Sequence, residues 1–492
     1  MNVLLLYPRF PDTFWSFKHA LKFIGKRSSL PPLGLLTVAA MLPREWEKRL
    51  VDVNVRRLRD RDLASADIVM ISAMIAQRDS AVQLIARCRA AGKTIVAGGP
   101  LFTVEHERFP DVDHFVLNEA ETTLAEFLRD FEQGRARRVY TSALLPELGE
   151  TPEPLWELID LRRYASMSVQ YSRGCPFDCD FCSVTAMLGH RPRVKTAAQI
   201  TAELDGLWRQ GWRGAVFFVD DNLIGNKRSL REDLLPALIR RRAEGRGYTF
   251  FTEASINLAD DENLMKQMAA AGFDQVFIGI ETPEEAGLAE CNKRQNRSRD
   301  LVADVKRIQR AGLQVQGGFI VGFDTDLPTV FQRQTEFIQK SGIVTAMVGL
   351  LQAIPGTPLY ARMKLQGRLL GETTGDNVDG TTNFVPRMNR ETLRLGYRQL
   401  MDYLYAPGPY YRRIRTFLRE FRPQRASSAV TSRDVRALAR ASIRLGVIGR
   451  ERFHFWGLLL WTCFRRPKLV PMAVTLSIYG FHFRKCCDAL GG

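Results

Sequence analysis

Three cysteines, Cys175, Cys179 and Cys182, lie within eight residues of one another in the segment 171–182, which reads YSRGCPFDCDFC. Thiolate sulfur binds zinc, copper(I) or iron–sulfur clusters in preference to hard cations. A structural zinc site needs a fourth protein ligand, and the nearest candidate, His190, lies eight residues beyond Cys182. A [4Fe-4S] cluster held by only three cysteines keeps one iron free for another ligand. The spacing therefore favours an iron–sulfur cluster, with a zinc knuckle or three packed cysteines as the alternatives.

The C-x3-C-x2-C spacing, with Phe181 before the last cysteine, resembles the motif of the radical S-adenosylmethionine enzymes. In that family the free iron binds the amino and carboxylate groups of S-adenosylmethionine. An electron from the cluster then cleaves the sulfonium, and the resulting 5′-deoxyadenosyl radical abstracts hydrogen from carbon. The resemblance implies that Cys175, Cys179 and Cys182 are the catalytic residues and the ligands of a [4Fe-4S] cluster. It also implies S-adenosylmethionine as a cofactor and a low-potential electron donor of the flavodoxin or ferredoxin type as a partner.

Residues 1–140 alternate short apolar runs with helical segments, which predicts a doubly wound parallel α/β sheet. We expect strands at 2–7, 48–55, 68–72, 94–97 and 114–117, with helices such as 79–91 between them. Ligands of such sheets bind at the carboxyl ends of the strands, and glycine there lets the backbone approach a ligand closely. The residues at or near those ends are Pro32, Leu33, Gly34, Asn54, Ser72, Gly98, Gly99, Pro100, Asn118, Glu119 and Glu121.

The position of this sheet, directly upstream of the cysteine motif, resembles that of the cobalamin-binding domain in the cobalamin-dependent branch of the family. Many cobalamin proteins carry D-x-H-x-x-G, whose histidine ligates cobalt, whereas this chain has Asp52-Val53-Asn54 at the corresponding strand end. The resemblance therefore implies cobalamin bound without a histidine ligand, in contact with the strand-end residues named above. A flavodoxin-like domain without a ligand remains the alternative, because a fold does not prove a function.

A proline-rich stretch at 141–165 breaks this pattern and is the expected linker. Residues 166–385 then repeat the alternation, with strands expected at 168–172, 215–219, 248–251, 275–280, 315–321 and 346–353. Six strand and helix repeats are too few for a closed eight-stranded barrel, so we expect a partial (β/α)6 barrel of the radical S-adenosylmethionine type. Its active residues should lie at the carboxyl ends of the strands.

Polar residues and glycines follow these strands, and the family resemblance assigns them to S-adenosylmethionine. Asp220, Asp221 and Asn222 follow the second strand, where the family contacts the methionine amino group. Glu281 ends the fourth strand, where a polar residue commonly holds the ribose hydroxyls. The other implied contacts are Phe181, Glu253, Gly318, Ile320 and Gly322, of which the last three match the family's G-x-I-x-G, whose apolar side chain packs on adenine. For the acidic residues and Asn222 the alternative role is a helix N-cap.

Residues 386–492 contain 21 Lys and Arg but six Asp and Glu, so +15 of the net charge of +16 lies in this part of the chain. We expect a basic helical domain, with helices at 390–405, 409–421, 432–445, 451–464 and 471–487. Such a charge attracts the phosphates of nucleic acid or anionic lipid, but no recognised nucleic-acid-binding module accompanies it. The longest uncharged run, 469–483, has 15 residues, fewer than the roughly 20 that span a bilayer. It is expected to be a core helix, an interfacial membrane helix or a lid over a hydrophobic substrate.

Residues 1 to about 385 together with this tail resemble most closely the branch that contains the hopanoid C2 methylases, and segments 219–226 and 278–283 contribute to the likeness. The resemblance implies transfer of a methyl group from methylcobalamin to an unactivated carbon of a hydrophobic isoprenoid or lipid-like substrate. One alternative is an enzyme of the same architecture that catalyses cyclisation or oxidation without methyl transfer. A second is a basic membrane or nucleic-acid adaptor with a vestigial cluster.

The first residues show no signal peptide pattern, because the apolar run 3–6 lacks a basic flank and leads directly to Pro8. The eight cysteines are unevenly placed, and three of them belong to the motif, which favours a reducing compartment over a disulfide framework. The sequence therefore predicts a cytoplasmic protein. Peripheral contact with the inner face of the membrane, through the basic C-terminal domain, stays open.

Overall fold

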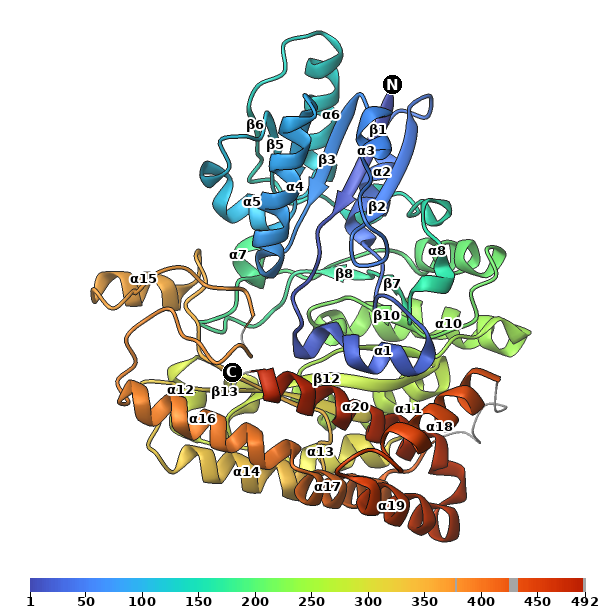
Figure 1. Cartoon of the computed structure of the whole chain (residues 1–492), viewed down its shortest axis with the longest axis vertical. Coiled ribbons are helices and arrows are strands. Elements are labelled where there is room, and N and C mark those ends of the chain that lie inside the picture. Colours follow the sequence, from blue (N-terminus) through green and yellow to red (C-terminus); the bar gives the residue numbers. More distant parts are fainter. Residues whose placement is uncertain (377, 424–431, 490–492) are drawn as a thin grey trace.

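The computed structural model describes residues 1–376, 378–423 and 432–489. Figure 1 shows two parallel sheets, one above the other, with a layer of helices from the end of the chain below them. The expected α/β architecture, with a doubly wound sheet, a partial barrel and a helical C-terminal part, is confirmed.

The N-terminal sheet has six parallel strands in the order β2-β1-β3-β4-β5-β6. These are β1 (Asn2–Tyr7), β2 (Glu47–Asp52), β3 (Ile68–Ser72), β4 (Thr94–Gly98), β5 (His114–Val116) and β6 (Val139–Tyr140). The sequence analysis missed β6, which is only two residues long. Side chains of β1 alternate between two cores, since Val3 and Leu5 lie in one and Leu4 and Leu6 in the other.

Helices cover both faces of this sheet, as the strand alternation predicts. On one face lie α2 (Leu33–Met41) and α6 (Ala120–Glu132), whose Leu36 and Phe127 join the core that holds Leu5. On the other face lie α3 (Asp60–Ala64), α4 (Arg78–Ala90) and α5 (Pro100–Glu105). The carboxyl ends of all six strands consequently face one edge, and that edge meets the second sheet.

The second sheet has six parallel strands in the order β14-β13-β12-β11-β10-β7, and β7 does not pair with β14, so the barrel is open. The strands are β7 (Met167–Val169), β10 (Val216–Phe218), β11 (Phe250–Glu253), β12 (Phe273–Glu281), β13 (Gln314–Val321) and β14 (Ala346–Leu350). Between them run α8 (Ala197–Arg209), α10 (Leu235–Arg241), α11 (Glu262–Ala271), α13 (Leu301–Arg310) and α14 (Val330–Ser341).

The strand expected at 168–172 is divided in two. After β7 the chain leaves the sheet, and Ser172–Arg173 forms a separate strand, β8, that pairs in an antiparallel hairpin with β9 (Arg193–Val194). The cause is Asp220, which accepts hydrogen bonds from the backbone N–H groups of Tyr171 and Ser172 and draws the chain toward the end of β10. The loop with the three cysteines therefore starts from a hairpin.

The C-terminal part consists of α16 (Arg390–Tyr405), α17 (Pro407–Glu420), α18 (Ser432–Arg444), α19 (Arg452–Arg465) and α20 (Val470–Ala489), after a shorter α15 (Pro358–Leu365). Helix α16 starts at Asn389, whose side chain caps two N–H groups, and it buries apolar residues at a helical spacing. None of the described helices combines the length and the apolar character that crossing a membrane would require.

The N-terminal segment between β1 and α2 leaves its own sheet and joins the helical layer. Its helix α1 (Lys18–Ile24) packs against α20 and α18 (Figure 1) and faces the strands of the second sheet across a cavity. The ring of Phe14 stacks on that of Phe483 with 4.9 Å between centroids. The segment between β1 and α2 and the C-terminal helices therefore cover the barrel together.

Candidate functional site

The three cysteines lie in one loop between β8 and α7 (Val184–Leu188). The loop begins at Gly174, which has a φ of +96° and no room for a side chain, because a Cβ there would lie 2.9 Å from each of two backbone carbonyl oxygens. Two backbone bonds fix its course, from Cys175 N to Gly189 O (3.2 Å) and from Cys182 N to Cys179 O (3.0 Å). All three thiols are unpaired with other cysteines.

Side-chain amides reach two of the sulfurs. The Asn222 amide donates to Cys175 Sγ at 3.9 Å, and the Gln295 amide donates to Cys179 Sγ at 3.8 Å. Burial raises the pKa of the Cys182 thiol to about 12, so without a metal this thiol stays protonated. N–H donors to sulfur suit thiolates that are bound to iron, since they offset part of the negative charge.

A buried cation also faces the cysteine loop. The ammonium of Lys293 lies 2.7 Å from Glu281 Oε1 and 5.9 Å from the ring centre of Phe181. Although burial opposes its charged form, Glu281 and then Cys179 hold the pKa of Lys293 above its ordinary value. A permanent positive charge here fits an anionic iron–sulfur centre.

Among the described residues, no three His, Cys, Asp or Glu side chains converge closely enough to hold a single metal ion. A [4Fe-4S] cluster offers a separate iron to each thiolate, so its ligands do not meet at one point. The loop, the amide donors and Lys293 together fit such a cluster.

The three residues that follow β10 lie near the cysteine loop, but each has different surroundings. Asp220 is fully buried, and both of its oxygens are engaged by Tyr171 and Ser172, although burial raises its pKa to about 7. Asn222 bridges Cys175 and the backbone N–H of Ser255 (3.2 Å). Asp221 is the exposed member of the three. The structure thus engages Asp220 in holding the hairpin, and its contact with S-adenosylmethionine stays a prediction, as do those of Asp221 and Asn222.

Glu253 and Glu281 end β11 and β12. Burial, together with the charge of Asp221, raises the pKa of Glu253 to about 8. Glu281 adopts a φ of +63°, a strained conformation for glutamate, and is paired with Lys293. Glu281 is thereby linked through Lys293 to the cysteine loop, and the ligand contacts of both carboxyl groups remain predictions.

On β13, Gly318 and Ile320 point to the inside of the barrel, and Gly322 follows with a φ of +105°. Ile320 packs in one apolar cluster with Phe181, so two of the expected contacts of S-adenosylmethionine lie together. A side chain at Gly318 would come within 2.8 Å of the Phe277 ring. These positions fit a ligand that needs an apolar wall and close backbone approach.

The expected cobalamin residues line the carboxyl edge of the N-terminal sheet. Ser72, Gly98 and Gly99 are only partly buried there and Asn118 is exposed, so the backbone at these strand ends is accessible to a large ligand. Pro32, Leu33 and Gly34 start α2, and Pro100 is the first residue of α5. Asn54 instead holds the local backbone, because its amide bonds Pro8 O (3.1 Å) and Asp52 and its oxygen accepts from Phe10 N. All of these contacts with cobalamin stay predictions.

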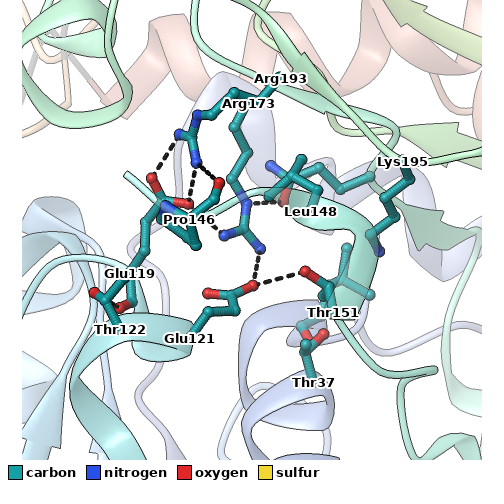
Figure 2. Close-up of polar contacts among 12 residues, drawn as sticks. Thr37, Glu119, Glu121, Thr122, Pro146, Leu148, Thr151, Arg173, Arg193 and Lys195 are labelled. Atoms are coloured by element: carbon teal, nitrogen blue, oxygen red, sulfur yellow. Dashed lines mark hydrogen bonds and ion pairs between the residues drawn. The ribbon is translucent and has the colours of Figure 1, made fainter. Parts of the chain in front are cut away.

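Glu119 and Glu121 have partners that the sequence analysis did not foresee. Figure 2 shows both carboxylates at the start of α6, facing Arg173 and Arg193 of the β8–β9 hairpin. Glu119 lies 2.6 Å from each guanidinium, and Glu121 lies 2.9 Å from that of Arg173. Because Arg173 is two residues from Cys175, these buried ion pairs connect the N-terminal sheet to the cysteine loop.

A cavity of about 490 Å³ lies between the inner face of the second sheet and the helices that cover it. Its wall is largely apolar: Phe217, Phe251 and Phe277 come from the strands, and the covering elements contribute Trp15, Leu21, Leu438, Val474 and Ile478. Phe217 and Phe251 stack with 4.7 Å between their centroids.

Polar groups form the smaller part of the cavity wall. Gln316 donates to Gln275 across its floor at 2.7 Å, and Asp274 has one carboxylate oxygen without a hydrogen bond within the described part of the chain. Glu253 lies at the opposite end, where the cavity approaches the carboxyl ends of the strands. The cavity therefore extends from the covering helices toward the carboxyl ends of the barrel strands, where the cysteine loop also lies.

Comparisons with known proteins agree with this arrangement. Residues 27–128 match the family model of the B12 binding domain, residues 169–328 that of the radical SAM superfamily, and residues 357–491 a domain of unknown function (DUF4070). The chain is 40% identical to an uncharacterized methyltransferase of Synechocystis sp. over 98% of this chain and 91% of the relative. It is 32% identical to the hopanoid C-2 methylase of Rhodopseudomonas palustris, over 92% of this chain and 88% of the relative.

Solved structures share the fold. OxsB, a cobalamin-dependent S-adenosylmethionine radical enzyme solved with aqua-cobalamin bound, superimposes with a TM-score of 0.65 at 14% identity, covering 100% of this chain and 84% of its own. The radical S-adenosylmethionine methyltransferase TsrM from Kitasatospora setae, solved with cobalamin and a [4Fe-4S] cluster bound, gives a TM-score of 0.58 at 17% identity, covering 81% and 85%.

Proposed function

The chain belongs to the cobalamin-dependent radical S-adenosylmethionine methyltransferases, and from this premise we propose that it methylates an unactivated carbon of a hydrophobic, isoprenoid-like lipid. Its cofactors are a [4Fe-4S] cluster, S-adenosylmethionine and cobalamin. When bound, the cluster with S-adenosylmethionine supplies hydrogen-abstracting radical chemistry, and cobalamin supplies the methyl group.

The observation that carries the substrate proposal is the apolar cavity in the barrel. Its volume of about 490 Å³ suits a molecule of the size of a small lipid, and three phenylalanines of the strands line it. A polar substrate would lose its hydration there with few hydrogen-bonding partners in return. The relative from Rhodopseudomonas palustris, whose name specifies a hopanoid, supports the same class of substrate.

Of the residues proposed to hold the cofactors, Glu253 also lines this cavity. Cys175, Cys179 and Cys182 would bind the cluster, with Asn222 and Gln295 as donors to sulfur. The strand-end residues of the barrel would hold S-adenosylmethionine, and the carboxyl edge of the N-terminal sheet would hold cobalamin. Helices α1, α18 and α20 would keep water from the substrate, because they form the wall of the cavity opposite the strands.

We further propose the domain division 1–140, 141–165, 166–385 and 386–492, and a cytoplasmic enzyme that contacts the inner face of the membrane through its basic C-terminal domain. The free state of all eight cysteines supports a reducing compartment. Members of the family need a reductant, and a flavodoxin- or ferredoxin-type protein is the proposed donor.

The test is transfer of an isotope-labelled methyl group from S-adenosylmethionine by the reconstituted enzyme. We expect label in the organic phase when a bacterial lipid extract is supplied, and 5′-deoxyadenosine in the same reaction. The variant Cys175→Ala should give neither product. Label found only in polar products would contradict a lipid substrate, and 5′-deoxyadenosine without any labelled product would favour cyclisation or oxidation.

A further inference from the structure

Helix α19 carries apolar side chains on two opposite faces. Its inner face, with Phe455, Leu458 and Leu459, is buried against α17 and α20. Its outer face carries Phe453 and Phe464, which are 77% and 84% exposed, together with Trp456 and Leu460. A helix that is apolar all round is normally buried on every side. The exposed half of α19 therefore needs a partner.

The exposed apolar residues continue over the turn before α19. Val447 and Ile448 lie in this turn, with Ile448 74% exposed, and Ile443 precedes them at the end of α18. The Trp456 indole N–H donates to Gly446 O at 3.0 Å, which ties the turn to the helix. We call Ile443, Val447, Ile448, Phe453, Trp456, Leu460 and Phe464 the outer face; such a concentration of exposed apolar side chains is a mark of an interaction site.

The charge around the outer face indicates the kind of partner. Residues 432–468 contain nine Lys and Arg but two Asp and Glu. Arg450 and Arg452 stand at one end of α19, and Arg465 and Lys468 stand at or beyond the other. A second copy of the same chain would bring an equally basic surface to the contact, and the two would repel each other. An anionic surface is the complementary partner.

We propose that the outer face binds to an anionic lipid bilayer, with α19 lying in the plane of the interface. Aromatic and aliphatic side chains on one face with flanking arginines are the composition of such interfacial helices. With 14 residues, α19 is shorter than the roughly 20 residues that a membrane span needs, so it lies along the surface. In Figure 1, α19 forms the lower margin of the molecule, far from the N-terminal sheet.

This contact extends the proposed function, since a lipid substrate can then enter from the bilayer. The cavity wall includes Val435 and Leu438 of α18, which are 57% and 37% exposed and belong to the helix that leads into the outer face. Binding to the bilayer requires neither cofactors nor turnover. Its test is therefore independent of whether a lipid is methylated.

The experiment is flotation of the full-length protein with vesicles of phosphatidylcholine alone or with about 30 mol% phosphatidylglycerol, enough to generate a negative surface potential. We expect flotation with the anionic vesicles, weaker flotation with the neutral ones, and release at high salt. The double variant Phe453→Ser/Phe464→Ser should lower the partition coefficient at least about tenfold, because two large apolar side chains no longer enter the interface.

The matched control is Leu144→Ser/Leu365→Ser, which removes two leucines that are 76% and 89% exposed but lie far from the outer face in the sequence. It should float like the unaltered protein, and circular dichroism should show both variants folded. Equal flotation of both double variants, or a salt-insensitive dimer that only Phe453→Ser/Phe464→Ser dissociates, would overturn the proposal.

Discussion

Replacing Arg193 with methionine should weaken the connection between the N-terminal sheet and the cysteine loop. Arg193 is buried, and its guanidinium donates to both oxygens of Glu119 (2.6 and 3.1 Å) and to the carbonyls of Pro146 (2.6 Å) and Leu188 (3.1 Å). Methionine keeps much of the length of the side chain but none of these donors. Glu119 would retain Arg173 as a partner at 2.6 Å.

The size of the effect follows from burial. Removing one member of a buried ion pair leaves an uncompensated charge and costs about 3–5 kcal/mol of the free energy of unfolding. The remaining pair with Arg173 reduces this loss, while the two carbonyls left without a donor add to it. We therefore expect a loss of about 3 kcal/mol, which for a chain of this length lowers the unfolding midpoint by about 3 °C.

The assay is thermal unfolding followed by circular dichroism, with iron and cobalamin retention measured on the same samples. The control is Arg162→Met, because Arg162 pairs with Asp160 at 2.9 Å on the surface, where ion pairs contribute little. The Arg193→Met variant should unfold at a lower temperature and retain less of both cofactors, whereas Arg162→Met should match the unaltered protein. Equal midpoints for the two variants would refute the coupling.

Two further changes test the site itself. The first change is Glu253→Gln, at a carboxyl group whose pKa is raised to about 8. The protonated carboxyl stabilises the fold fully below pH 4.5, and this stability is lost as the pH rises through about 8. The glutamine variant should therefore gain stability relative to the unaltered, cofactor-free protein across this pH range, and an equal pH dependence of the unfolding midpoint in both proteins would contradict the burial of Glu253. The second change is Gly279→Ala, whose new Cβ would overlap Glu281 and lie 2.9 Å from Lys293 Nζ. The ion pair between Glu281 and Lys293 should then break, iron retention should fall, and the free energy of unfolding should decrease by about 1–3 kcal/mol. Unchanged iron content would show that Lys293 does not support the cluster.

The sequence was most informative where short segments determine the structure. Apolar runs predicted every strand of the two six-stranded sheets except β6 within a few residues, because a buried parallel strand must be apolar on both faces. The spacing of Cys175, Cys179 and Cys182 likewise fixes the chemistry of their loop, since metal ligands so close in the chain need little from the rest of the fold.

The sequence was least informative about partners far apart in the chain. Glu119 stands at a strand end, where a ligand contact is the natural expectation, and its pairing with Arg193, 74 residues away, depends on how the two sheets meet. Lys293 and Gln295 belong to no motif, so their place beside the cysteines could not be predicted from their neighbours. The same holds for the cavity, whose wall combines residues from Trp15 to Tyr479.

The most direct test of the central claim, a lipid substrate in the barrel cavity, is the ratio of labelled lipid product to 5′-deoxyadenosine in the variant Val474→Trp. Val474 of α20 borders the cavity, and the larger ring would occupy the space proposed for the substrate, while the residues proposed to hold the cofactors stay unchanged. The control Leu365→Trp places the same ring on an exposed position of α15. The account predicts that Val474→Trp still forms 5′-deoxyadenosine but yields little labelled lipid, whereas Leu365→Trp yields both. Undiminished lipid methylation by Val474→Trp would contradict it.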